Sequence, residues 1–167
     1  MASSTARALF PFVLAALLPA CAETPPREVT PWATTFPVRG SANINALSVD
    51  AYSGGVALAG TFSGTMDFGT GPLESYFGSD LFVAELGDTG TPAWGGHTGG
   101  ASYLGQQGVV VAPNGDVVAT GMFTDSIGFG GAPLKATGQS SYLVRFDAAG
   151  NLFICDTLND RVRRVWR

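Results

Sequence analysis

The only histidine of the chain, His97, lies in the segment GGHTGG and is the first residue to consider for catalysis. As a general base it would need a nucleophile and an orienting acid within hydrogen-bond reach. Ser102 and Asp116 stand at no spacing that is typical of such a group, and a Gly-rich loop holds catalytic geometry poorly. We therefore interpret His97 as an exposed loop residue, and we expect no catalytic residues and no enzymatic activity.

The chain also offers little for a metal ion or a cofactor. One histidine and one free cysteine, Cys155, cannot form a zinc site of standard spacing. The acids Asp50, Asp88 and Asp116 lack the density of a calcium-binding loop and are typical of turn formers. The Gly-rich segments GTGPLES and GFGGAPLK lack the Gly-Lys-Ser/Thr ending of a phosphate-binding loop. The sequence thus predicts no metal and no cofactor.

Aromatic and arginine side chains could instead form a contact surface. Six aromatic residues recur at equivalent positions of an internal repeat, which favours packing in the core: Phe62, Phe68, Phe82, Phe123, Phe129 and Tyr142. The aromatic residues that do not recur are better candidates, and the arginines near the C-terminus could bind an anion or form the solvated face of a strand. The candidate surface contacts are therefore Tyr52, Tyr76, Phe77, Tyr103, Arg161 and Arg163.

The N-terminal segment has the layout of a secretory signal. One basic residue is followed by an apolar run at residues 8–18, and small residues precede Cys21. The run is too short to span a bilayer stably, and Pro11 and Pro19 disfavour the alternative of a buried helix because each removes a helical hydrogen bond. We therefore predict that residues 1–20 are a signal peptide.

The segment LLPAC, which ends at Cys21, resembles a bacterial lipobox. The resemblance implies that Cys21 becomes the first residue and carries lipid, so that acyl chains anchor the protein to a membrane. Residues 21–31 are rich in Pro and Thr and would form the tether. Ala22 rather than Asp follows the cysteine, which by resemblance to lipoprotein sorting implies the outer membrane. The alternative is an ordinary signal, with a disulfide between Cys21 and Cys155.

Charge is distributed unevenly along the chain. From Gly40 to Leu134 there are eight acids and no Lys or Arg, whereas four arginines fall within the last seven residues. The formal net charge of the whole chain is −4 at pH 7. A protein that binds nucleic acid through its body needs a basic patch to neutralise phosphates. An acidic body therefore argues against nucleic acid as a partner.

The chain repeats itself with a period of about 61 residues, so that residues 32–90 align with residues 94–150. The aligned pairs include Trp32 and Trp94, Val49 and Val110, Gly54 and Gly115, Gly60 and Gly121, and Phe62 and Phe123. Glycines and aromatic residues match more often than charges. This bias is expected if the repeat preserves turns and packing rather than a chemical site.

Within each copy the apolar residues alternate with a period of two. LSVDAYSGGVALAGTF and GVVVAPNGDVVATGMF each read as two strands around a turn, and DLFVAEL and SYLVRFD read as third strands. Asn114-Gly115-Asp116 can supply the positive φ that a tight hairpin requires. A further hairpin is predicted near the C-terminus, with strands at 152–156 and 161–166. No window after the signal has helical spacing, so the sequence predicts an all-β fold of antiparallel hairpins.

A repeat of this length with three or four short strands is typical of propeller blades. Residues 32–150 resemble the bacterial seven-bladed β-propeller repeat family (SBBP) in the segments GTFSGTMDFG, GSDLFVAEL and PNGDVVATGMF. The segment GNLFICDTLNDRVRRV, at 150–165, resembles an NHL repeat, another propeller module. These resemblances imply one blade at 32–93, a second at 94–150 and an NHL-like terminal hairpin at 151–167.

Propellers usually close with about four to eight blades, whereas this chain would supply about two and part of a third. Such a piece leaves sheet faces uncovered and edge strands unpaired. Three explanations remain open. Several chains could complete a ring as a homo-oligomer, the chain could form a short open stack of sheets, or it could be a truncated or rearranged fragment of a longer propeller protein.

Together these patterns predict an exported, lipid-anchored, non-enzymatic propeller-type protein at the bacterial cell envelope. Its expected partners are the membrane, through the lipid, and a protein or polysaccharide. One alternative is a fragment with no independent function. Another is an accessory part of an envelope hydrolase, which the scarcity of histidine and the lack of grouped carboxylates disfavour.

Overall fold

The structure, a computed structural model, describes residues 30–75, 78–129, 133–156 and 161–165. Within these ranges the chain forms eleven strands and no helix. The strands are β1 (Val38–Val49), β2 (Val56–Asp67), β3 (Pro72–Glu74), β4 (Asp80–Leu86), β5 (Pro92–His97), β6 (Gly99–Val111), β7 (Val117–Gly128), β8 (Leu134–Lys135), β9 (Ser140–Phe146), β10 (Leu152–Asp156) and β11 (Arg161–Val165). The predicted all-β class is confirmed.

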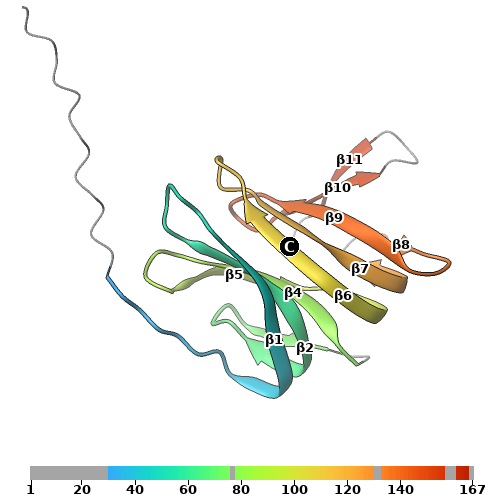
Figure 1. Cartoon of the computed structure of the whole chain (residues 1–167), viewed down its shortest axis with the longest axis horizontal. Helices are drawn as coiled ribbons and strands as arrows, with labels where there is room; N and C mark the ends of the chain where they lie inside the picture. Colours follow the sequence, from blue (N-terminus) through green and yellow to red (C-terminus); the bar gives the residue numbers. More distant parts are fainter. Residues whose placement is uncertain (1–29, 76–77, 130–132, 157–160, 166–167) are drawn as a thin grey trace, which may run out of the picture.

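The strands form two antiparallel sheets with the same topology (Figure 1). The first sheet has the order β1-β2-β4-β5, with β3 paired to β2. The second has the order β11-β10-β9-β7-β6, with β8 paired to β7, so that β6 to β10 repeat β1 to β5. Most of each repeat thus lies in one sheet, and the strand that completes the sheet, β5 or β10, follows the end of the aligned copy. The boundary predicted between residues 93 and 94 falls inside β5, the last strand of the first sheet.

Three of the hairpin turns share one geometry. In the turn 112–116, the Ala112 amide donates to the Asp116 carbonyl at 2.8 Å, and the Gly115 amide donates to the Ala112 carbonyl at 2.9 Å. The turns at 87–91 and 147–151 make the same two bonds. Such a three-residue loop requires a left-handed residue at its last position, and Gly115 has a φ of 83°. The positive φ predicted for this turn is confirmed.

Each sheet has two faces, because side chains alternate along a strand. We call face A the one that carries the large aromatic residues, and face B the opposite one. Face A carries Leu58, Phe62, Phe82 and Ala84 in the first sheet and Ala119, Phe123, Tyr142 and Val144 in the second. Face B carries Ala57, Ala59, Leu81 and Val83 in the first sheet and Val118, Thr120, Ser141 and Leu143 in the second.

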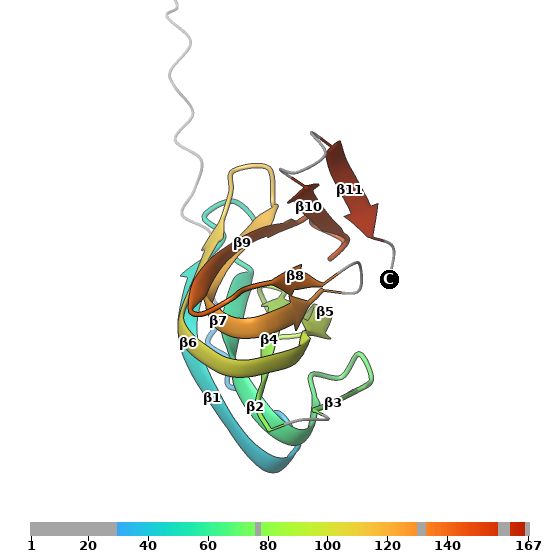
Figure 2. The same cartoon turned by 90° about the vertical axis from the view of Figure 1, so that its right-hand side faces the viewer.

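Face A of the second sheet packs on face B of the first, and the two form one buried cluster. Trp94, on β5, belongs to it, and its ring centroid lies 5.2 Å from that of Phe146 on β9. The first strands of the two sheets, β1 and β6, run side by side (Figure 2). There the Val111 amide donates to the Ser48 hydroxyl oxygen at 3.2 Å. The sheets therefore stack in a head-to-tail order, A on B.

Two glycines that match in the sequence repeat have the same neighbour in space. A Cβ atom at Gly60 would lie 2.6 Å from the Phe82 ring, and one at Gly121 would lie 2.5 Å from the Tyr142 hydroxyl. In both sheets an aromatic side chain thus lies over the opposite strand at a position without a side chain. The repeat preserves this packing contact, which explains why glycines and aromatic residues match most often.

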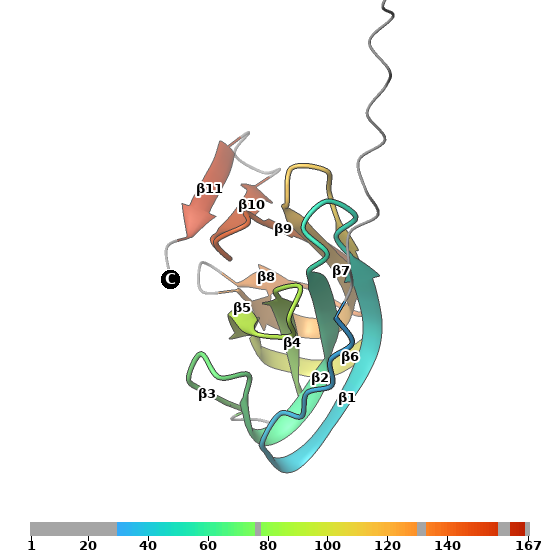
Figure 3. The ribbon, with the colours of Figure 1, turned by 90° about the vertical axis from the view of Figure 1, so that its left-hand side faces the viewer.

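The segment before β1, which we call the strap (residues 30–37), covers part of face A of the first sheet (Figure 3). The Phe36 ring meets the buried Phe68 ring edge-on, with centroids 4.8 Å apart. The Asp67 amide donates to the Pro37 carbonyl at 3.0 Å. Through these contacts the strap covers the part of face A around Phe68, and no other described sheet packs on face A of the first sheet.

The strap also reproduces a contact of the strand β5. A Cβ atom at Gly90 would lie 2.5 Å from the Trp32 ring, and one at Gly150 would lie 2.7 Å from the Trp94 ring. Both glycines are left-handed, with φ of 78° and 77°. Relative to the first sheet, the strap therefore stands where β5 stands relative to the second.

Two further predictions concern the terminal hairpin and the closure of a propeller ring. The strands predicted at 152–156 and 161–166 appear as β10 and β11, and the turn 157–160 lies outside the described residues. The described strands form two sheets and no closed propeller. The number of blades in a working assembly, and the SBBP and NHL resemblances, stay predictions.

Candidate functional site

Several of the predicted surface contacts lie outside the described part of the chain. These are the lipid-attachment residue Cys21 and the aromatic residues Tyr76 and Phe77. Tyr103, Arg161 and Arg163 lie in described strands, β6 and β11, but their side chains are outside the description. For these residues the prediction stands untested.

Tyr52 is the one predicted contact whose side chain is described, and it is 77% exposed. It lies in the turn between β1 and β2, where its amide donates to the Asp50 carboxylate at 2.8 Å. Tyr103 lies near the start of β6, in the part of the strand that pairs with residues 123–125, and thus far from the equivalent turn at 112–116. The structure therefore does not bring Tyr52 and Tyr103 into one site.

His97 lies in a strand rather than in an exposed loop, so our interpretation of this residue was wrong. It is the last residue of β5, it is half-buried, and it pairs with Phe82 of β4. Its ring lies edge-on to that of Phe62, with centroids 5.8 Å apart. The glycines around it belong to a pleated strand, where a small residue leaves room for face A aromatic rings such as Phe68 beside Gly95.

Asp80 is the polar group of this region that the sequence reasoning missed. It begins β4 in the apolar segment DLFVAEL, is 2% exposed, and its Oδ2 atom has no hydrogen-bond partner in the described structure. Burial raises the pKa of the Asp80 carboxyl above its ordinary value, and the charge of His97 lowers this pKa in part. The available signal was an acid directly before the apolar run LFVA at 81–84.

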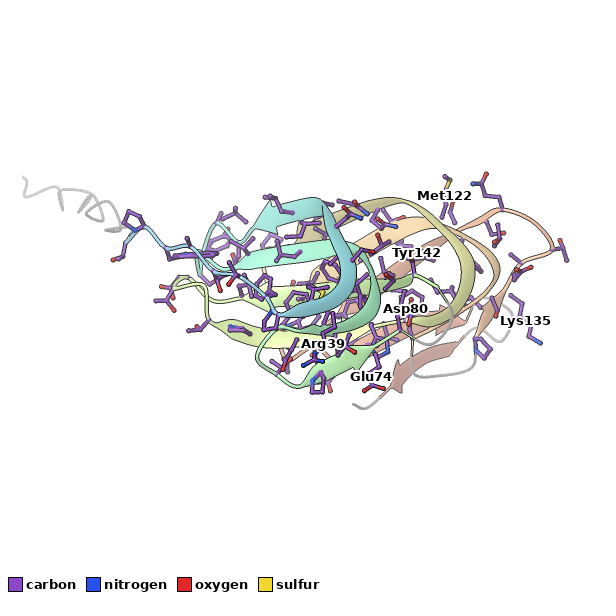
Figure 4. All side chains as sticks on the ribbon, turned by 90° about the horizontal axis from the view of Figure 1, so that it is seen from below. Arg39, Glu74, Asp80, Met122, Lys135 and Tyr142 are labelled. Carbon is purple, nitrogen blue, oxygen red and sulfur yellow. The ribbon has the colours of Figure 1, made fainter. Side chains whose placement is uncertain are left out.

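Two buried hydroxyl groups also lack partners in the described structure. They are the Thr98 Oγ1 atom, on a residue that follows β5, and the Tyr142 hydroxyl on β9. Burial raises the pKa of Tyr142, so the hydroxyl stays protonated. Figure 4 shows Tyr142 and Asp80 inside the molecule, whereas Lys135 points outward. We call Asp80, His97 and Thr98 the β4–β5 polar group.

The β4–β5 polar group contains an acid, an imidazole and a hydroxyl, but its geometry does not favour chemistry. Asp80 and His97 belong to face A, since His97 pairs with Phe82 and Asp80 lies on the same face of β4 as Phe82, whereas Thr98 alternates to the other face. A nucleophile such as the Thr98 hydroxyl and its base must lie within hydrogen-bond reach of each other, which requires them to be on the same face of the sheet. The second sheet carries Ser140 where the first carries Asp80, so the polar group is not repeated.

Two further polar contacts among the described residues support the fold. The Trp94 Nε1 atom donates to the Glu85 carboxylate at 2.7 Å across β4 and β5. Burial raises the pKa of Glu85, while this hydrogen bond lowers it in part. Arg145 forms an ion pair with Asp116 at the turn before β7. Each of these contacts joins neighbouring strands of one sheet.

Face B of the second sheet is open where the same face of the first sheet is buried. Leu143 on β9 is 72% exposed on this face, and Val110 stands on the same face of β6, with β7 between the two strands. Next to them is a shallow depression, lined by Gln107, Gly108, Thr120, Gly121, Met122 and Ser141. This candidate surface is therefore an apolar sheet face rather than a polar cleft.

Comparison with protein-family models and with curated proteins gave no match for this chain. Among the described residues, no group of three or more His, Cys, Asp or Glu side chains is placed to hold a metal ion. The described part of the chain likewise has no helix that is long and apolar enough to cross a membrane.

Proposed function

We propose that this protein is an exported, lipid-anchored repeat protein without enzymatic activity, which acts as an interaction module at the bacterial cell envelope. The observation that carries the proposal is what the two sheets have in common. They share a strand order, hairpin turns and glycine–aromatic contacts, whereas the β4–β5 polar group occurs in one sheet only. A repeat that keeps its packing and not its polar residues is suited to present surfaces.

The lipid anchor is tested with the full chain, expressed in a bacterial host that is fed a tagged fatty acid. The unaltered chain should carry the tag and sediment with membranes, because acyl chains supply the membrane affinity. The Cys21→Ser chain should lose both properties. An untagged mature chain, or equal membrane association of the Cys21→Ser chain, would overturn the anchored location.

The interaction role is tested on the same cells by chemical crosslinking through surface groups, followed by denaturing purification. A discrete crosslinked species, containing a protein or a polysaccharide, is the expected result. A chain that is made and anchored but gives no crosslinked species at any reagent concentration would contradict this role. That outcome would favour the fragment with no independent function.

A further inference from the structure

Large apolar side chains are exposed in two places on the sheets. Six of them are more than half exposed, and all but one lie on a sheet face. Val110 (53%) and Leu143 (72%) stand on face B of the second sheet. Ile44 (52%), Leu47 (64%) and Val49 (59%) stand on face A of the first sheet, along β1. Exposed apolar surface gathered in this way is typical of a contact with another protein.

The two exposed faces are the two halves of an interface that the chain already makes once. Leu47 and Val49 pair with β2 at the positions where Val109 and Val111 pair with β7. Val109 and Val111 pack against the core that joins the sheets, whereas Leu47 and Val49 have no sheet before them. The sequence alignment placed Val49 on Val110, and the structure shifts this by one residue, because the turn after β1 is longer.

The strap leaves this part of the first sheet open. It stands only where the last strand of a preceding sheet would stand, over Phe68 and the turn at Gly90. Within the chain, the first strand of the first sheet, β1, lies beside the first strand of the second sheet, β6. If another sheet preceded the first one in the same way, its first strand would lie beside β1. On face A of the first sheet, the strap therefore covers the part around Phe68 and leaves the part along β1 uncovered.

We propose that a second copy of this chain fills the gap: face B of its second sheet, around Leu143 and Val110, docks on face A of the first sheet, around Leu47 and Val49. The inference deepens the interaction role proposed above, because it names the partner. The contact repeats the A-on-B order seen within the chain, and it requires the strap to move aside, because β10 of the docking copy would take the place that the strap holds. It is heterologous, so it joins copies head to tail into a ring or an open filament.

The contact is expected to be weak in solution. Three strands spaced about 4.8 Å apart, over about six residues of 3.3 Å each, give a footprint of roughly 200–300 Å². Stable complexes bury about 800 Å² on each partner, so we expect a dissociation constant in the micromolar range or above. Anchoring of many copies to one membrane would raise their effective concentration and strengthen the association.

The test is sedimentation analysis of residues 22–167, which contain all eleven strands, from about 10 µM to about 1 mM. The unaltered chain should show a concentration-dependent rise in mass. Leu47→Glu and Leu143→Glu should each remain monomeric. An equimolar mixture of these two variants should form dimers that grow no further, because one copy then has an intact face A and the other an intact face B.

Other results would overturn the proposal. Association of the Leu47→Glu variant by itself would indicate a symmetric contact of two B faces. Association that persists in both variants would indicate pairing of edge strands. A monomer at every concentration would show that the faces stay open. Thr137→Glu, at an exposed position between β8 and β9, is the matched control and should associate as the unaltered chain does.

The outcomes also separate this inference from the proposed function. If the chain stays monomeric but is lipidated and crosslinks to a different protein or to a polysaccharide, the function stands and the second copy is not the partner. If it associates head to tail but Cys21 carries no lipid, the interface stands and the anchored location falls. Circular dichroism of all four chains checks that each variant keeps its strands.

Discussion

At the residue scale, Asp80 is the group whose environment departs most from that of an ordinary surface acid. Its side chain is buried at the start of β4, and one carboxylate oxygen has no hydrogen-bond partner in the described structure. Desolvation disfavours the charged form, and the nearby His97 offsets this only in part. A buried polar atom without a partner destabilises the folded state by about 1–3 kcal/mol.

Replacing Asp80 by Asn should therefore change how stability depends on pH. The folded state of the unaltered chain binds the Asp80 proton more tightly than the unfolded chain, whose carboxyl titrates near 3.8. The stabilisation by this proton is full below that pH and is lost as the pH rises through the raised pKa of the folded state. The difference in unfolding free energy, Asp80→Asn minus unaltered, should thus increase from pH 3 towards pH 7 in urea titrations. A difference that is constant with pH would contradict this.

Gly121 is a second residue whose identity is set by one contact. A Cβ atom there would lie 2.5 Å from the Tyr142 hydroxyl, so Gly121→Ala should force the ring to shift. Overpacking of this kind costs about 1–3 kcal/mol of unfolding free energy, measurable by urea denaturation. Gly138→Ala is the matched control, because nothing lies within 4 Å of its Cβ position. Equal stability of the two variants would show that the aromatic ring moves freely.

At the element scale, the strap and β5 use one device, a tryptophan packed on a left-handed glycine of the next turn. Trp94 is 6% exposed, contacts Phe146 and donates a hydrogen bond to Glu85. Trp32 makes the equivalent glycine contact but is 38% exposed, since the strap is a single segment at the edge of the molecule. The same residue type should therefore contribute unequally in the two elements.

Truncation of the two tryptophans measures this inequality. Trp94→Ala should lower the unfolding free energy by about 3–5 kcal/mol, because it leaves a cavity between the sheets. Trp32→Ala should cost clearly less, since much of its ring is already in water. Trp94→Phe, which keeps a ring but removes the donor to Glu85, should fall between them. Similar losses for both alanine variants would mean that the strap is as important as the shared core.

At the scale of the whole molecule, the two sheets depend on one another. The largest buried cluster takes residues from both, including Leu81 and Val83 of β4 in the first sheet and Phe123 and Val144 of the second. The other cluster lies on face A of the first sheet alone, beneath the strap. Face B of the first sheet and face A of the second are buried only because these two faces pack on each other.

The two sheets should accordingly unfold as one unit. Backbone amides in β4 and β9 should show equal free energies of opening in native-state hydrogen exchange, because loss of one sheet exposes the core of the other. Val83→Ala, placed in the first sheet, should lower protection in β9 as much as in β4. Protection that falls only in β4 would show that the second sheet is stable by itself.

Some features of this protein follow from the sequence alone. The alternation of apolar residues predicted three strands of each repeat (β1, β2 and β4, then β6, β7 and β9) and the terminal hairpin, because side chains that alternate between two faces give a local pattern of period two. It did not predict the short strands β3 and β8, nor β5. Gly115 indicated its turn, because a left-handed residue is a local requirement. The period of about 61 residues indicated two units of one kind, and the structure gives them the same strand order.

Other features were decided only by the tertiary structure. Period two separates the faces of a strand but does not say which face another sheet covers, since that depends on residues about 60 positions away. For this reason His97 was placed in a loop, Asp80 was overlooked, and Leu143 could not be distinguished from the buried Val144. The open face B, the strap and the uncovered β1 all result from which sheet has a neighbour, and contact between distant segments determines this.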